Sequence, residues 1–118
     1  MKTMAITNNP LVRDKVSNIA LDYKSISYID ILKCVRDKIH LGHQLLSHPL
    51  SGSIKPGQTP YKTIIISSEK SQLDTDGLRI IEDSIATAIK LIGNQNTTNW
   101  TENVLSDFQL IDYDLIFK

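Results

Sequence analysis

Strand and helix patterns alternate along this chain, and the alternation limits the folds that it can adopt. Residues 2–7 form a short β-type run, and residues 19–23 form a second one. Between them, Asn9 suits the N-cap of a helix and Pro10 suits its first position, so a helix is expected to continue to about Val16. A strand, helix, strand order is typical of layered α/β domains.

The clearest helix is predicted over residues 27–42. Ser27 and Asp30 form a variant of the capping box, and Gly42 supplies a left-handed end. The apolar residues between them recur at helical spacing: Tyr28, Ile31, Leu32, Val35 and Ile39. A second long amphipathic helix is predicted from Asp74 to Gly93.

Further strands are expected in the second half of the chain. Residues 61–67 read as a buried β-branched strand, and residues 44–47 suggest a short one before it. Asn99 and Glu102 predict a brief helix to about residue 106. The tail FQLIDYDLIFK is expected to be a strand, because Asp112 and Asp114 alternate with apolar neighbours.

These patterns predict the fold class. The 118 residues fit one domain, residues 1–118, because domains most often contain about 100 to 150 residues. We expect an α/β fold: a single layered domain with a mostly parallel central sheet of four to five strands, flanked by helices.

Composition excludes several kinds of partner and site. The 13 basic and 13 acidic side chains balance, which argues against nucleic acid and against an acidic membrane surface as partners. A single cysteine, Cys34, excludes an internal disulfide and a multi-cysteine metal site. No apolar run approaches the roughly 18 residues of a membrane span, and the start of the chain lacks the apolar core of a signal peptide. A cytoplasmic protein is therefore expected.

The stretch SHPLSGSIKPGQTPYK, residues 47–62, is much longer than the median connection of about 4 to 6 residues. It lies within residues 38–68, which contain lysines and all three histidines but no acid. Ser51, Gly52 and Ser53 can turn backbone N–H groups toward an oxyanion, and Lys55 can neutralise its charge. The alternative is an ordinary exposed connection, which also favours Pro, Gly, Ser and Lys.

The turn TNNP is the second candidate, since ligands of open α/β sheets bind beyond the carboxyl ends of strands. Its alternative is a purely structural turn, because Asn tolerates tight turns and Asn9 already suits a cap. Taken with the loop, the turn predicts one site for a small anion. The expected ligand-binding residues are Asn8, Asn9, His48, Ser51, Gly52, Ser53 and Lys55.

Catalysis and metal binding have fewer residues to support them. His43 and His48 differ by five, which places them on opposite faces of an extended chain, and no third ligand follows, so no metal and no cofactor is expected. Candidate catalytic residues are His48 with Ser51 or Ser53, acting on an acyl or phosphoryl compound. No residue is placed to orient His48, which favours a non-enzymatic binding protein over an enzyme.

Three stretches together resemble one family over nearly the whole chain. ITNNPLV, HPLSGSIKPGQTPYKTI and NWTENVLSDFQLIDYDLI are similar to the GrdX family, small proteins encoded beside glycine reductase genes. The resemblance implies a cytosolic accessory protein of glycine, sarcosine or betaine reduction and transfers no catalytic residue. The expected partners are a small anionic ligand or components of glycine reductase.

Overall fold

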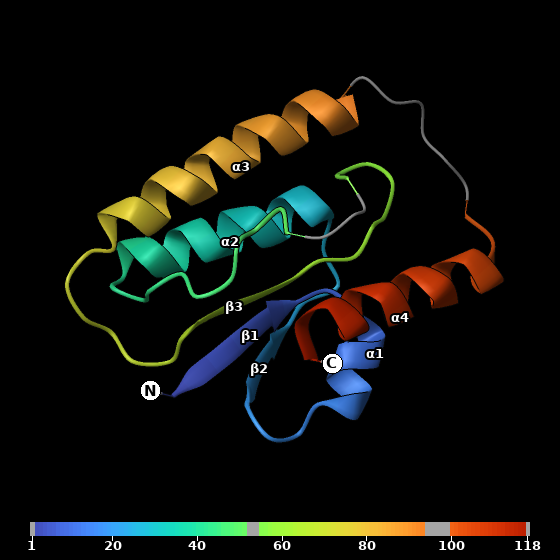
Figure 1. Cartoon of the computed structure of the whole chain (residues 1–118), viewed down its shortest axis with the longest axis horizontal. Helices are drawn as coiled ribbons and strands as arrows, with labels where there is room; N and C mark the ends of the chain where they lie inside the picture. Colours follow the sequence, from blue (N-terminus) through green and yellow to red (C-terminus); the bar gives the residue numbers. More distant parts are fainter. Residues whose placement is uncertain (1, 52–54, 94–99, 118) are drawn as a thin grey trace.

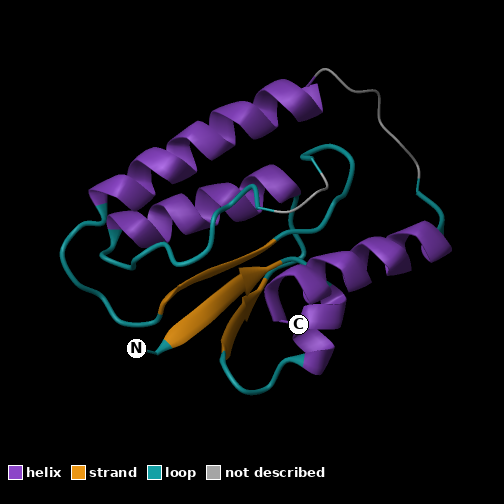
Figure 2. Ribbon diagram, viewed as in Figure 1, coloured by secondary structure: helices purple, strands orange, loops and turns teal. Residues whose placement is uncertain are grey.

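The computed structural model describes residues 2–51, 55–93 and 100–117. Three strands and four helices follow one another along these residues (Figures 1 and 2). They are β1 (Thr3–Thr7), α1 (Pro10–Lys15), β2 (Ala20–Tyr23), α2 (Tyr28–His40), β3 (Thr63–Ser67), α3 (Thr75–Gly93) and α4 (Glu102–Phe117).

The sheet corrects the predicted fold class. It has three strands in the order β2-β1-β3, with β1 parallel to β2 and antiparallel to β3. The prediction of a mostly parallel sheet of four to five strands is therefore wrong. The long loop explains the direction of β3, since it returns the chain to the carboxyl end of β1, where Thr63 pairs with Thr7.

The segment at residues 44–47 does not form the predicted strand. Leu45 makes a single antiparallel bridge with Ile66, and the N–H groups of Leu46 and Ser47 both donate to the carbonyl of Ile65, at 2.9 and 3.2 Å. The Ser47 hydroxyl accepts from the Ile65 N–H at 2.9 Å. This segment therefore covers the outer edge of β3 without becoming a full strand.

Residues 102–117 form the helix α4, so the predicted strand in the tail is also wrong. The Thr101 hydroxyl accepts from the Val104 N–H at 3.3 Å and the helix continues to Phe117. Asp112, expected on an exposed face of a strand, is buried in this helix. The predicted Asn99 cap lies outside the described residues.

Other local predictions are confirmed. Asn9 caps α1 by accepting from Leu11 N, and Ser27 caps α2 by accepting from Asp30 N. Gly42 has the left-handed φ of 109° that ends α2. Asp74 accepts from Gly77 N at 2.9 Å, at the start of α3.

Helices lie on both sides of the sheet, with α2 and α3 on one side and α1 and α4 on the other (Figure 1). Ile6, Ile64 and Ile66 face α2 and form the main core with apolar residues of α2 and α3. Because side chains alternate along a strand, Thr7 and Thr63 face α4 instead. Within the described chain, no helix is long and apolar enough to cross a membrane.

Candidate functional site

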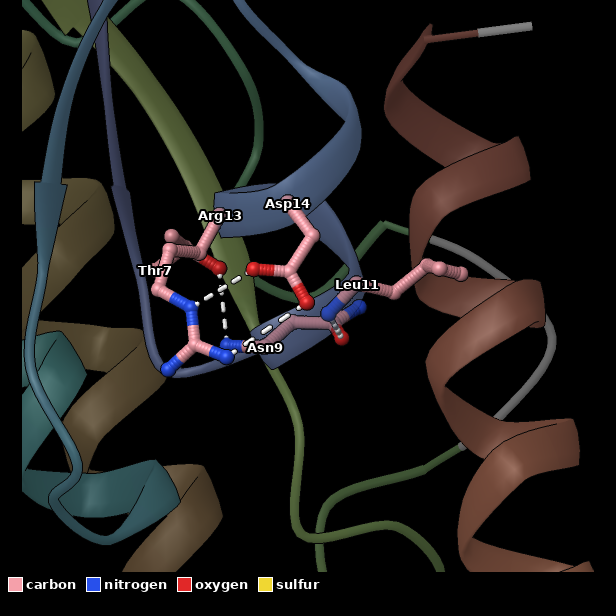
Figure 3. Close-up of polar contacts among 5 residues, drawn as sticks. All are labelled: Thr7, Asn9, Leu11, Arg13 and Asp14. Carbon is pink, nitrogen blue, oxygen red and sulfur yellow. Dashed lines mark hydrogen bonds and ion pairs between the residues drawn. The ribbon is translucent and has the colours of Figure 1, made fainter.

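The turn that follows β1 is held by its own side chains. The Asn9 N–H donates to the Thr7 hydroxyl, and Asn9 Oδ1 accepts from the Leu11 N–H, both at 3.0 Å (Figure 3). Arg13 and Asp14 form a neighbouring ion pair at 2.9 Å, which is exposed and contributes little to stability. The two hydrogen bonds of Asn9 fix the direction in which the chain leaves the sheet.

Asn8 links three separate segments. Its Nδ2 donates to the carbonyls of Ile26 and Pro60, at 2.9 and 2.8 Å, and its Oδ1 accepts from the Lys62 N–H at 2.8 Å. Both side-chain donors are thus satisfied within the protein. In this structure Asn8 positions the end of the long loop and the start of β3.

Asp112 of α4 lies at the centre of a buried polar cluster. Its Oδ2 accepts from the Thr63 hydroxyl at 2.6 Å and from Asn9 Nδ2 at 3.0 Å. The Thr7 and Thr63 hydroxyls are 2.7 Å apart, and Asn9 Nδ2 also donates to the Gln109 carbonyl. The cluster joins β1, β3 and α4 and accounts for both donors of Asn9.

Lys62, immediately before β3, is a buried lysine with a relative exposure of 4%. Its Nζ donates to the carbonyl of Ser51 at 3.3 Å, and it forms no ion pair with any described residue. Burial lowers the pKa of Lys62, and the negative charge of Asp112 opposes this effect in part. Lys62 is therefore a cation whose charge is incompletely compensated by the protein.

Lys62 lines a cleft of about 320 Å³ between α4 and the long loop. Its polar lining comprises Tyr28, Ser51, Thr59, Tyr61, Lys62, Asp112 and Asp114, and its apolar lining comprises Phe108, Ile111 and Leu115. This volume is at the lower end of the range for small-molecule pockets, about 300 to 1,000 Å³.

Two tyrosines add hydrogen-bond donors to the cleft. The Tyr28 hydroxyl has no hydrogen-bond partner among the described residues, and burial, with a smaller effect of the Asp112 charge, raises the pKa of Tyr28 well above its ordinary value. Tyr28 thus stays protonated. The Tyr61 hydroxyl accepts from Gln109 Nε2 at 2.9 Å, which leaves its own proton available to donate.

A second cavity of about 660 Å³ adjoins the cleft and shares Tyr28, Thr59 and Tyr61 with it. Its remaining walls come from the turn after β1, the start of α2, the end of α3, the start of α4 and the long loop. They are Asn8, Ser25, Ile26, Ser27, Ile29, Gly57, Pro60, Ile92, Trp100 and Leu105.

The long loop contributes unequally to this region. Ser51 lines the cleft, whereas Lys55 is exposed and its N–H donates to Gln58 Oε1 at 3.4 Å. His48 is exposed, and its Nδ1 accepts from the Leu50 N–H at 3.1 Å. The predicted residues Gly52 and Ser53 lie outside the described residues.

The predicted turn and loop meet at Lys62, whose backbone N–H binds Asn8 and whose Nζ binds the Ser51 carbonyl. His43 is elsewhere and buried, with Nδ1 2.7 Å from the Ser67 carbonyl. In residues 2–51, 55–93 and 100–117, no three His, Cys, Asp or Glu side chains are grouped to hold a metal ion.

Sequence reasoning missed Lys62, Asp112 and both tyrosines. Tyr61 and Lys62 fall where the long loop and the predicted strand overlap, and Tyr28 falls on the apolar face of a predicted helix. Asp112 was assigned to an exposed strand face. The available signal was the charge of Lys62 directly before a buried strand, a position where burial of the side chain requires a partner.

Comparisons with known proteins place the chain in a family. Residues 4–118 match the model of the GrdX-like protein family, which is associated with glycine reductase genes. Neither the curated proteins nor the solved structures contain a match. Because the family match spans nearly the whole sequence, this chain belongs to the GrdX-like protein family.

Proposed function

We propose that this chain is a non-enzymatic accessory protein of glycine, sarcosine or betaine reductase metabolism, and that it binds a small anionic ligand in the cleft at Lys62. The observation that carries the proposal is the buried ammonium group of Lys62, which has one hydrogen bond of 3.3 Å and no ion pair within the described chain. A buried charge is costly unless a partner compensates it. An anion in the cleft is such a partner.

The donors around the cleft support an oxyanion. The Tyr28 and Tyr61 hydroxyls can each donate a proton, and both residues line the same cleft as Lys62. Hydrogen bonds between charged donors and carboxylate or phosphate oxygens are shorter and about twice as strong as neutral ones. The Lys62 ammonium group and the two tyrosine hydroxyls can therefore each donate a hydrogen bond to a ligand.

The long loop forms the rim in this proposal. Ser51 lines the cleft, and Lys55 is an exposed cation on the same loop that can attract an anion toward it. His48, an exposed residue of the same loop, is proposed to contribute to the rim. Asn8 and Asn9 act indirectly, because their side-chain donors are already used within the protein: those of Asn8 bind the Ile26 and Pro60 carbonyls, and those of Asn9 bind Gln109 and Asp112. Asn8 Oδ1 positions Lys62 by accepting from its N–H.

An enzyme that uses His48 and a loop serine has less support. His48 is exposed, and its Nδ1 already accepts from the Leu50 N–H. A general base needs a nitrogen within reach of the proton it removes and a group that orients the ring. Among the described residues, no hydrogen bond joins the His48 imidazole to a serine hydroxyl or to a carboxylate.

Calorimetric titration with acetate, glycine, acetyl phosphate and inorganic phosphate tests the proposal. We expect at least one of them to bind, and Lys62→Met to weaken that binding roughly ten-fold to a hundred-fold, as expected for a lost charge-assisted hydrogen bond. Lys55→Met should weaken it less, because Lys55 is exposed.

Lys70→Met is the matched control, since Lys70 is exposed beyond the far end of β3 and should leave affinity unchanged. Circular dichroism would confirm that each variant is folded. Absence of binding to all four compounds, or unchanged affinity in Lys62→Met, would refute the proposal.

A further inference from the structure

The cleft at Lys62 and the larger cavity beside it meet at a common wall. Both are bordered by Tyr28, Thr59 and Tyr61, and their volumes are about 320 and 660 Å³. The start of α2, the end of α3 and the start of α4 all lie on the same side of the molecule (Figure 1), and residues from or beside each of them border the larger cavity. The two spaces are therefore adjacent compartments of one region.

Their linings differ in chemistry. The smaller compartment is lined by Lys62 and Asp112. The larger one is bordered by apolar side chains and by the uncharged polar residues Asn8, Ser25 and Ser27, and among the described residues its ionisable groups are the shared tyrosines. The apolar residues are Ile26, Ile29, Pro60, Ile92, Trp100 and Leu105. A ligand that matches both compartments carries a charged end and an apolar end.

The charges of the smaller compartment select among anions. Asp112 also lines it, so a dianion such as phosphate is repelled more strongly than a singly charged carboxylate. Oδ2 of Asp112 is occupied by Thr63 and Asn9 and is not available to the ligand. A singly charged carboxylate is therefore a better match for this compartment than a dianion.

We propose that the ligand is an amphipathic monocarboxylate, with its carboxylate at Lys62 and its apolar part in the compartment bordered by Ile92 and Trp100. This inference rests on the proposed function and adds the ligand class to it. The carboxylate accepts hydrogen bonds from Lys62, Tyr28 and Tyr61. The apolar part leaves water for the larger compartment, which contributes the greater share of the affinity.

The inference predicts a dependence on chain length. Burial of each methylene favours binding by about four-fold before the cost of ordering the chain is subtracted. Hexanoate should therefore bind between about ten-fold and a few hundred-fold more tightly than acetate, with butyrate between them. Hexanamide, which has the same apolar part and no charge, should bind at least ten-fold more weakly than hexanoate.

Two variants separate the compartments. Trp100 and Leu105 line the larger compartment and not the smaller one, so Leu105→Ala should weaken hexanoate several-fold and leave acetate unchanged. Trp100→Ala should weaken hexanoate likewise, but Trp100 also packs edge-to-face on Phe108, which lines the smaller compartment, so Leu105→Ala is the cleaner test. Val104→Ala is the matched control, because Val104 is the exposed neighbour of Leu105 and does not line either compartment. Unchanged acetate affinity also shows that the variants retain the smaller compartment, and Leu105→Ala provides the test if Trp100→Ala fails to fold.

Titrations of acetate, butyrate, hexanoate and hexanamide into the native chain and these variants distinguish the two claims. Equal affinity for acetate and hexanoate would overturn the inference and leave the proposed anion site intact. If Lys62→Met leaves hexanoate affinity unchanged, both the proposed anion site and the inferred ligand class would be overturned. If none of the carboxylates binds, the inference is overturned. If phosphate then still binds and its binding depends on Lys62, the proposed anion site stands without the amphipathic ligand.

Discussion

The Thr63 hydroxyl donates to Oδ2 of Asp112 at 2.6 Å, across 49 positions of sequence. This bond fastens α4 to the first residue of β3, one position after Lys62. Asn9 adds a second bond to the same oxygen from the turn after β1. Asp112 therefore belongs both to the buried cluster and to the lining of the cleft. By holding Thr63, the cluster positions the neighbouring Lys62 in the cleft.

Removal of the Asp112 carboxylate should destabilise the fold. Asp112→Ala leaves the donors of Thr63 and Asn9 without their acceptor, and we expect a loss of about 2 to 4 kcal/mol of unfolding free energy. Urea denaturation measures it. Asp107→Ala, an exposed change on the same helix, should stay within about 0.5 kcal/mol. Equal effects of the two variants would contradict a structural role for the cluster.

Replacement of Asn8 should also destabilise the fold, because Asn8 joins three segments of the chain. Asn8→Ala removes the acceptor of the Lys62 N–H and the donors to Ile26 and Pro60, and we expect a cost of about 2 to 3 kcal/mol. The comparison variant is Asn103→Ala, which is exposed on α4. A thermal unfolding midpoint that falls no further for Asn8→Ala than for Asn103→Ala would show that the loop does not depend on these bonds.

The two glycines at helix ends should respond in opposite ways to alanine. A Cβ at Gly42 would lie 2.7 Å from the Ser71 carbonyl oxygen, at a φ of 109°, so Gly42→Ala should cost at least about 1 kcal/mol. A Cβ at Gly93 meets nothing within 4 Å, so Gly93→Ala should be neutral or stabilise the helix by up to about 1 kcal/mol. Both values come from urea denaturation, and a Gly42→Ala variant as stable as Gly93→Ala would refute the strain argument.

Burial of Lys62 predicts a dependence of stability on pH. Burial lowers the pKa of Lys62 below its ordinary 10.5, so the unfolded chain holds this proton to higher pH than the folded chain. The contribution of Lys62 to stability should therefore rise with pH between the lowered value and 10.5. The raised pKa of Tyr28 acts in the opposite direction, but only near and above pH 10, where unfolded tyrosines ionise.

Unfolding free energies of the native chain and of Lys62→Met, measured from pH 7 to 9.5, isolate this effect. The difference, native minus variant, should increase toward high pH. A difference that is constant or that falls over this range would mean that Lys62 is not held in a desolvating environment.

Local signals in the sequence predicted most helix ends correctly. Asn9, Ser27, Asp74 and Gly42 act through bonds or dihedrals within a few residues, which a sequence pattern can reveal. The strand over residues 61–67 was also anticipated, although its direction was not. Direction depends on where the long loop returns the chain, and no local pattern encodes that path.

The C-terminal segment shows why the spacing of apolar residues can predict the wrong secondary structure. Phe108, Ile111 and Leu115 fit helical spacing, while Ile111 and Leu115 also fit the alternation of a strand around Asp112 and Asp114. The carboxylate of Asp112 decided the prediction, because an acid between apolar residues suggests a solvent-facing position. In the structure Asp112 is buried with two donors, and this compensation comes from residues about fifty and a hundred positions away.

Sequence patterns predict only some of the residues around the proposed cleft, because part of the cleft is assembled by contacts between distant segments. The loop and the turn were identified from composition, and the structure brings Asn8 and Ser51 to opposite ends of Lys62. Lys62 falls where the loop and the predicted strand overlap, and Tyr28 falls on the apolar face of a predicted helix. Their convergence depends on tertiary packing, which places their side chains in one cleft.

A crystal structure of the native chain with bound 4-bromobenzoate tests the anion site most directly, because the anomalous signal of bromine fixes the orientation of the ligand. We predict a carboxylate oxygen at a hydrogen-bond distance of about 3 Å from Lys62 Nζ, with the bromine in the compartment bordered by Ile92 and Trp100. A ligand bound in the reverse orientation, or bromine peaks confined to surfaces away from Lys62, would contradict the account.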